Sequence, residues 1–186
     1  MKKVILLKAI LILFMNGYSQ EEELVKNNFQ GTRLVNGQSA NLAEKGELLL
    51  LIQHRFGNIN GGFYEFFGLD QASMRLGFEY GFGKNFNLGI GRSTYLKTYD
   101  LFGKFRIIQQ SGSFPFTAVL SAGGSFPVIK DYFPEDYDSF SDKVSGNVQL
   151  HLATTIKKLS FQVSPGYLKT GYLPEESDDL SIFTMA

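Results

Sequence analysis

Runs of about ten residues in which apolar and polar side chains alternate restrict the fold of this chain more than any other feature. In residues 73–82, Met74, Leu76 and every second side chain after them are apolar or aromatic, and the positions between them are polar or glycine. Because successive side chains of a strand point to opposite faces, this period of two predicts β-strands. The same alternation recurs in residues 99–108, 144–156 and 159–167.

Four further segments are weaker strand candidates. Residues 86–97 and 116–126 alternate less strictly, residues 47–56 begin with an almost continuous apolar run, and residues 180–186 open a short eighth strand. The chain is therefore expected to be all-β, with one apolar and one polar face to its sheet.

Arg92 conflicts with this simple pattern. It shares the parity of apolar neighbours such as Ile90, and an arginine that faces lipid in mid-strand costs about 2–4 kcal/mol. Glycine within a strand often marks a bulge. We therefore predict a bulge at residues 89–91 that turns Arg92 inward and Tyr95 outward.

Strand length and loop length favour a membrane barrel over a soluble sandwich, which would also alternate. A strand that spans a bilayer needs about 9–11 residues, whereas strands of soluble proteins usually have about 5–6. Short connections alternate along the chain with long ones, which is typical of outer-membrane barrels. The short connections are residues 83–85, 111–113 and 157–158, the long ones are residues 58–72, 127–142 and 171–179, and Thr98 is a short exception.

We therefore predict an antiparallel up-and-down transmembrane β-barrel over residues 46–186, with seven full strands and the start of an eighth. Single-chain bacterial barrels have even strand numbers, and an unpaired edge in lipid is costly. The barrel is therefore expected to be incomplete. C-terminal truncation of a longer protein would explain this, and closure of the sheet by several copies is the alternative.

The N-terminus predicts export. Two lysines precede a run over residues 4–15 that is apolar apart from Lys8, and Gly17 and Ser19 place small residues at −3 and −1 of a cleavage site. Residues 1–19 are therefore predicted to be a signal peptide. A membrane anchor is less favoured, because a helix of that length spans only about 18 Å of a core about 30 Å thick. Residues 20–45 are polar without a sustained period, and are predicted to form a periplasmic segment.

Several short motifs lie between and within these strands. They are Gly31-Thr32-Arg33, Asn36-Gly37-Gln38-Ser39, His54-Arg55-Phe56-Gly57, Gly68-Leu69-Asp70-Gln71-Ala72-Ser73, Tyr80-Gly81 and Gly89-Ile90-Gly91-Arg92-Ser93. Together they resemble an uncharacterised membrane-bound β-barrel family of Gram-negative bacteria, over about residues 29 to 170. The resemblance implies an outer-membrane barrel and no particular reaction or ligand.

Composition excludes several classes of function. The absence of cysteine removes disulfides, thiolate metal sites and cysteine catalysis. The balance of 18 basic and 18 acidic residues removes the basic surface of a nucleic-acid binder. His54 and His151 lie far apart without ligand spacing, so no metal site is expected. No catalytic residue and no cofactor is predicted, although a Ser-His site assembled in space stays possible.

Two groups of charged residues are candidate sites. The first, predicted to face the lumen, could line a pore or could pair within a filled interior. It consists of Arg75, Glu79, Asp100, Lys104 and Arg106. The second could bind a hard cation such as Ca²⁺ or form solvated extracellular loops, and solvated loops are the favoured reading. It consists of Asp131, Glu135, Asp136, Asp138 and Asp142, with Glu175, Glu176, Asp178 and Asp179.

The sequence thus predicts an outer-membrane protein with a structural or passive pore-type role. The alternative is an interaction component that docks a secretion or redox partner through its loops or its N-terminal segment. The expected partners are the lipid bilayer of the outer membrane and the machinery that inserts barrels, and no nucleic acid. Long loops are expected outside and short turns in the periplasm, so an acidic outer rim would make any pore prefer cations.

Overall fold

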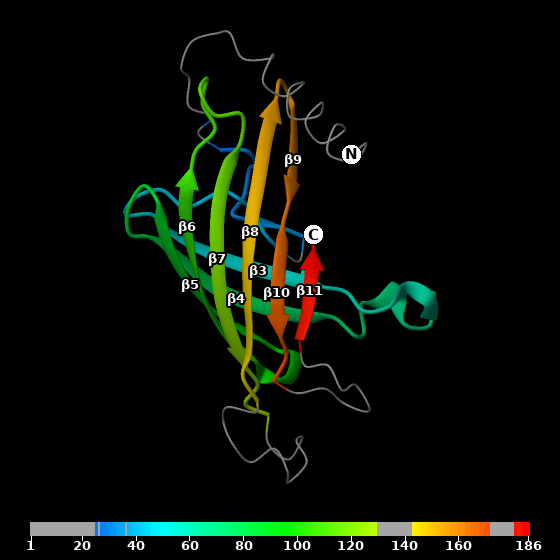
Figure 1. Ribbon diagram of the computed structural model, residues 1–186. Helices are drawn as coiled ribbons and strands as arrows, with labels where there is room; N and C mark the ends of the chain where they lie inside the picture. Colours follow the sequence, from blue (N-terminus) through cyan, green and yellow to red (C-terminus); the bar gives the residue numbers. More distant parts are fainter. Residues whose placement is uncertain (1–24, 26, 36, 130–142, 172–180) are drawn as a thin grey trace, which may run out of the picture.

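A computed structural model describes residues 25, 27–35, 37–129, 143–171 and 181–186 of the 186-residue chain. These residues form a large curved antiparallel sheet and a small hairpin (Figure 1). The predicted signal peptide and all nine acidic loop residues lie outside the described residues. Within the described part of the chain, no helix is both long and apolar enough to cross a membrane.

The large sheet confirms the predicted all-β, up-and-down architecture. Its strands are β3 (Leu48–Arg55), β4 (Ser73–Gly81), β5 (Phe86–Ser93), β6 (Tyr99–Ile108), β7 (Thr117–Phe126), β8 (Ser145–Ile156), β9 (Leu159–Val163), β10 (Pro165–Lys169) and β11 (Ser181–Met185). The order across the sheet is β11-β10-β8-β7-β6-β5-β4-β3, and β9 also pairs with β8. Since only Ser164 separates β9 from β10, these two form one long strand, and the count becomes seven full strands and a short eighth.

In strands β4 to β8 the polar face is the more buried one, whereas the inward positions of β3 include Leu49 and Leu51. In β4, Arg75, Gly77 and Glu79 are buried, whereas Leu76 and Phe78 are exposed. The largest fully buried side chains of the described residues are mostly polar, with Lys104, His151, Gln110 and Glu79 among them. A soluble sandwich buries its apolar faces instead, so this inverted arrangement is that of a barrel with a polar lumen and a lipid-facing exterior.

The sheet curls strongly, and β3 and β4 pass behind β8 and β10 (Figure 1). We call the space on its concave side the lumen. Strands β3 and β11 are the two edges of the sheet and do not pair with one another, so the described strands do not close into a barrel.

The predicted bulge in β5 is wrong. The strand pairs in unbroken register with β4 and β6, which places Arg92 opposite Leu76 and Tyr99 on the outer face. Arg92 is nonetheless not in mid-strand, because β5 ends at Ser93 and the turn η3 (Tyr95–Lys97) follows. Its guanidinium lies 5.5 Å from the ring centre of Tyr99, at the end of the strand, where a long cationic side chain can reach polar surroundings.

The connections that the structure describes follow the predicted alternation of length in part. The β4–β5 and β8–β9 connections are short, but the β6–β7 connection at the same end spans residues 109–116, longer than the predicted 111–113, and the β5–β6 connection at the opposite end spans only residues 94–98. We call the end with the β4–β5 and β8–β9 turns the short-turn end. At the other end, the long β3–β4 connection contains two single turns of 3₁₀-helix, η1 (Ile59–Gly61) and η2 (Phe66–Gly68).

Residues 28–35 and 37–43 of the N-terminal segment lie against the concave face of the sheet. Strands β1 (Arg33–Leu34) and β2 (Gly37–Gln38) pair as a hairpin, and Asn28, Thr32 and Ser39 around them are buried. This polar segment packs in the lumen because the inward-facing charges and amides of the strands form hydrogen bonds with it. The hydrophobic periodicity of the segment carries no sign of this contact, since polar groups make most of its hydrogen bonds to the lumen wall.

Candidate functional site

The hairpin enters and leaves the lumen at the end of the short turns. The backbone nitrogen of Val25 donates to the Gln110 oxygen at 3.1 Å, close to the β6–β7 turn. On the return path, the nitrogen of Gly46 donates to the Gly81 oxygen at 2.7 Å, at the end of β4. Between these points the chain passes the middle of the strands and turns at Val35. We call the described residues 28–35 and 37–43 the plug.

A buried ion pair holds the plug at mid-height. Lys104 Nζ lies 3.2 Å from Glu79 Oε1, and both side chains are fully buried. The same ammonium donates to the backbone oxygens of Thr32 at 3.0 Å and Asn41 at 2.6 Å, one on each arm of the plug. A buried charge is tolerated only when it is paired and hydrogen-bonded, so the plug carbonyls complete the surroundings that Lys104 requires.

Glu79 also forms a hydrogen bond with the plug. Its Oε2 accepts from the hydroxyl of Thr32 at 2.8 Å, and its Oε1 accepts from the amide of Asn87 at 2.9 Å. The donors to this carboxylate come from β5, from β6 and from the plug. The two charges therefore link wall and plug into one hydrogen-bonded unit.

A second ion pair lies nearer to the long-loop end. Arg75 donates from Nε to Asp100 Oδ2 at 2.7 Å and from a terminal nitrogen to Oδ1 at 2.5 Å, with a further bond to Gln53 at 3.0 Å. This forked geometry is the strong form of an arginine–carboxylate contact. Gly91 leaves room for it, since a Cβ at that position would overlap the guanidinium.

Arg33 of the plug lies above an aromatic ring of the wall. Its guanidinium carbon is 4.7 Å from the centre of the Phe102 ring, which occupies the space opened by Gly89. Burial, and then the positive charge of Arg75, lowers the pKa of Arg33 to about 10, so the group remains charged at neutral pH. Phe102 is the aromatic residue on the polar face of β6, and it stacks on a cation of the plug.

Four of the five predicted lumen charges thus form two ion pairs, and the fifth stands apart. Arg106 donates to Gln109 Oε1 at 3.2 Å and to the backbone oxygen of Lys84 at 3.4 Å, at the short-turn end. Pairing of these charges was one of the two alternatives predicted for them, and the structure shows it for Arg75 with Asp100 and for Lys104 with Glu79.

A second polar network, not predicted from the sequence, holds the returning arm of the plug. His151 Nε2 lies 2.7 Å from Ser121 Oγ, and His151 Nδ1 lies 2.9 Å from Ser164 Oγ. Gln162 donates to Ser164 Oγ and to the Gln38 oxygen, and accepts from the nitrogen of Ala40 at 2.8 Å. In the sequence, these four wall residues share one feature that pointed to such a network: each occupies an inward-facing position of its strand. They are Ser121, His151, Gln162 and Ser164.

The two histidines do not meet. His151 is fully buried in the lumen, whereas His54 is exposed on the other face of the sheet. In the part of the chain that the structure describes, no three or more histidine or carboxylate side chains gather as metal ligands would. The acidic loop residues lie outside that part.

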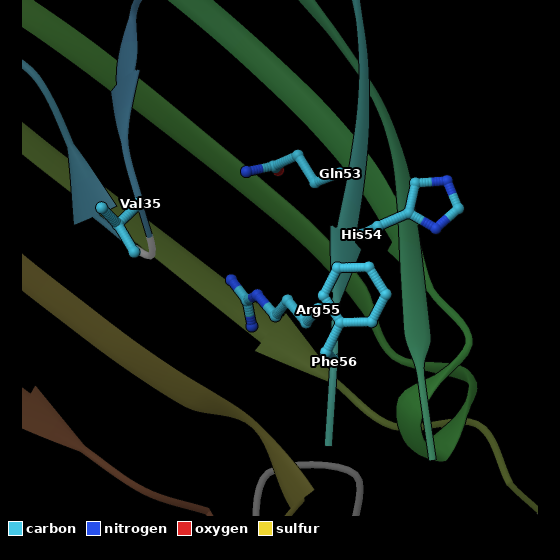
Figure 2. Close-up of a pocket in the computed structure, with 5 residues that line it drawn as sticks. All are labelled: Val35, Gln53, His54, Arg55 and Phe56. Atoms are coloured by element: carbon cyan, nitrogen blue, oxygen red, sulfur yellow. The ribbon is translucent and has the colours of Figure 1, made fainter. Parts of the chain in front are cut away.

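A pocket of about 410 Å³ lies at the long-loop end. It is lined by Val35 at the tip of the plug and by residues 53–56 of β3 and its end (Figure 2). In Figure 2, Gln53 and Arg55 point toward the side on which Val35 lies, and His54 points the other way. The plug therefore reaches from the short-turn end to the opposite mouth of the lumen.

Comparison with known proteins gives one match. The model of a protein family described as a membrane bound beta barrel domain matches residues 29–186, and thus includes the plug together with the sheet. No curated protein and no solved structure matches the chain.

Proposed function

Since the chain belongs to the family of membrane bound beta barrel domains, we propose that it is an outer-membrane barrel whose lumen is closed by its own plug. Its role is structural, or that of a passive pore that conducts only when the plug moves. The proposal includes export by the signal peptide over residues 1–19 and assembly by the insertion machinery of Gram-negative outer membranes.

The double contact of Lys104 with both arms of the plug is the observation that carries this proposal. An open pore would leave the buried Lys104–Glu79 pair facing water in a lumen, where such a pair needs no protein carbonyls. Here the wall residues are satisfied by the plug backbone. The plug is held by these polar contacts, which water can replace if the plug withdraws, and by a small apolar cluster in which Ala40 and Leu42 meet Val119 and Ala153 of the wall.

Planar-bilayer recordings test the proposal. The wild-type barrel is expected to show little conductance. A Glu79→Leu/Lys104→Met variant removes both buried charges together and deletes the bonds to Thr32 and Asn41, so it is expected to show stepwise openings. Lys84→Met, which changes an exposed lysine of the β4–β5 turn, is the matched control and should behave like wild type.

A steady, large wild-type conductance with the plug still protected from protease would overturn the closed-lumen proposal. So would a double variant whose plug is protease-sensitive and which nevertheless does not conduct. If the double variant does not insert, wild-type protein in graded urea serves instead. Reversible opening at urea concentrations below global unfolding is then the expected result, and its absence counts against the plug.

The way in which the plug enters the lumen favours a second candidate function. Both of its ends lie at the short-turn end, which is periplasmic in the expected orientation, so a periplasmic partner could bind the segment before Val25 and draw the plug out. This is the docking role in a secretion or redox assembly. Detergent pull-down with residues 20–27 deleted tests it, because the deletion should abolish a partner that full-length protein retains.

We further propose that the barrel is not an enzyme. Ser121 and His151 have the separation of a nucleophile and base, but Ser121 is only 2% exposed and the third group is a serine hydroxyl. Lipid-ester hydrolysis by purified barrel that disappears in Ser121→Ala, with the fold intact, would contradict this.

A further inference from the structure

The β3–β4 connection exposes a dense group of apolar side chains. Tyr64 is 94% exposed and Phe63 is 82% exposed, and the same connection also exposes Ile59, Phe66, Phe67 and Leu69. We call residues 59–69 the aromatic loop. In Figure 1 it projects away from the rest of the sheet, beyond the ends of β3 and β4. Apolar groups gathered so densely on a surface mark a site of interaction.

The loop has its own internal support, so these side chains are displayed on a defined backbone. The nitrogen of Gly57 donates to the Gly68 oxygen and that of Phe67 to the Gly62 oxygen, both at 2.8 Å. Phe66 and Phe67 have positive φ angles of 44° and 55°, a conformation that is costly for aromatic residues. A loop that only connected two strands would not need aromatic residues in such positions.

The loop continues the lipid-facing surface of the sheet. The outward side chains of β3 include Leu50 and Ile52, which are 57% and 58% exposed, and the same apolar surface reaches Phe56, 63% exposed, beyond the end of the strand. Because the family is membrane-bound, these outward side chains meet acyl chains. The aromatic loop therefore begins where the lipid-facing band ends.

The neighbouring connection has the composition of a membrane interface. The backbone nitrogen of Thr94 donates a hydrogen bond to the Met74 oxygen at 2.8 Å, and this bond holds η3 against the start of β4. Tyr95 and Lys97 of η3 are exposed, and Arg92 beside Tyr99 is exposed at the same end. Tyrosines and cations are the residues that sit at headgroup level, and the cations attract anionic headgroups.

From this continuity we propose that the aromatic loop inserts into the lipid leaflet at the long-loop end of the strands, as an interfacial anchor. Phe63 and Tyr64 enter the boundary between headgroups and acyl chains, while Arg92 and Lys97 contact headgroup phosphates. The loop thereby fixes the depth and tilt of the β3–β4 edge of the sheet. This proposal rests on membership of the membrane-bound family and does not depend on the plug.

The absence of tryptophan from the chain makes the test direct. Tyr64→Trp creates a single emitter, to be measured in vesicles containing a phospholipid brominated at a shallow or at a deep acyl position. Ile52→Trp on the outer face of β3 is the positive control, and Val35→Trp at the tip of the plug is the aqueous control. We expect blue-shifted emission for Tyr64→Trp, quenched at least twofold and more by shallow than by deep bromines, with no quenching of Val35→Trp.

Two other environments of the aromatic loop, solvent and a second copy of the chain, would give different results. Emission typical of water with no quenching by either lipid overturns the proposal, and means that the loop projects into solvent. Blue-shifted emission that is insensitive to bromine but falls as the protein is diluted in detergent also overturns it, and identifies a second copy of the chain as the occupant. Because Ile52→Trp reports on barrel insertion separately, failure of the loop to insert is distinguishable from failure of the sheet to insert.

Discussion

Gly81 at the end of β4 lies directly against the backbone of Glu44, where the returning arm of the plug leaves the lumen. A Cβ on Gly81 would overlap the Glu44 carbonyl oxygen and approach that of Ala43 to 2.8 Å. Both obstacles are backbone atoms, so a side chain at this position requires the plug itself to move. The glycine is therefore part of the contact between wall and plug.

Gly81→Ala is expected to loosen the plug and to destabilise the protein by about 1–3 kcal/mol, the usual cost of overpacking a tight contact. Limited proteolysis of the plug and urea unfolding in micelles measure the two effects. Gly83→Ala is the matched control, because nothing lies within 4 Å of the Cβ that it would add. Equal protease resistance of the two variants would show that the close contact with Glu44 is not required.

The Lys104–Glu79 pair should behave as a coupled unit. Lys104→Met alone leaves a fully buried carboxylate without its cation, which typically costs about 3–5 kcal/mol. The Glu79→Leu/Lys104→Met variant removes both charges, so we expect it to be more stable than the Lys104→Met variant. Urea midpoints for both single variants and the double variant give the coupling energy, and additive effects would contradict the pair.

The forked Arg75–Asp100 contact should not tolerate a lysine. Arg75→Lys keeps the charge but loses the planar guanidinium that reaches both carboxylate oxygens and Gln53. We expect a loss of about 1–3 kcal/mol in urea unfolding. Arg92→Lys at the exposed end of β5 is the control and should change stability by less than about 0.5 kcal/mol. The prediction fails if the two substitutions have equal effects.

Arg92 and Ile90 lie on the same outer face of β5 but at different depths in the membrane, so substitutions at the two positions should differ in their cost. Ile90 lies opposite Phe78 and Leu101, in the middle of the spanning strands. Ile90→Arg should therefore cost about 2–4 kcal/mol in a bilayer, as expected near the midplane. Arg92→Ala should be almost neutral. Folding equilibria in phospholipid vesicles measure both, and a large loss for Arg92→Ala would place that residue in a structural role.

The orientation of the barrel can be tested because the chain has no cysteine. Asp70→Cys, an exposed position of the β3–β4 connection beyond the aromatic loop, should react with a membrane-impermeant maleimide on whole cells. Lys84→Cys in the β4–β5 turn should react only after the outer membrane is permeabilised. These expectations follow from the rule that long loops are extracellular and short turns periplasmic. The reverse labelling pattern would invert the topology.

The sequence by itself determined the strands, their order and their polarity. Alternation with a period of two is a local property of the backbone, and it placed β6 (Tyr99–Ile108) at its observed bounds and the other strands close to theirs. The length of the runs and the alternation of loops were enough to predict the membrane barrel, and the short motifs were enough to predict its family. The regular path of β5 through Arg92 was missed because period alone does not report where along a strand the membrane ends.

The tertiary structure alone decided what fills the lumen. Residues 28–43 are mostly polar and without a period, so locally they look like a linker, and they are held by donors, acceptors and a few apolar side chains on strands far away in the sequence. Lys104 and Glu79 show this most clearly, since the curvature of the sheet brings them within hydrogen-bonding distance of Thr32 and, for Lys104, of Asn41. Hydrogen bonds to a buried charge depend on three-dimensional placement, and no spacing along the chain encodes that placement.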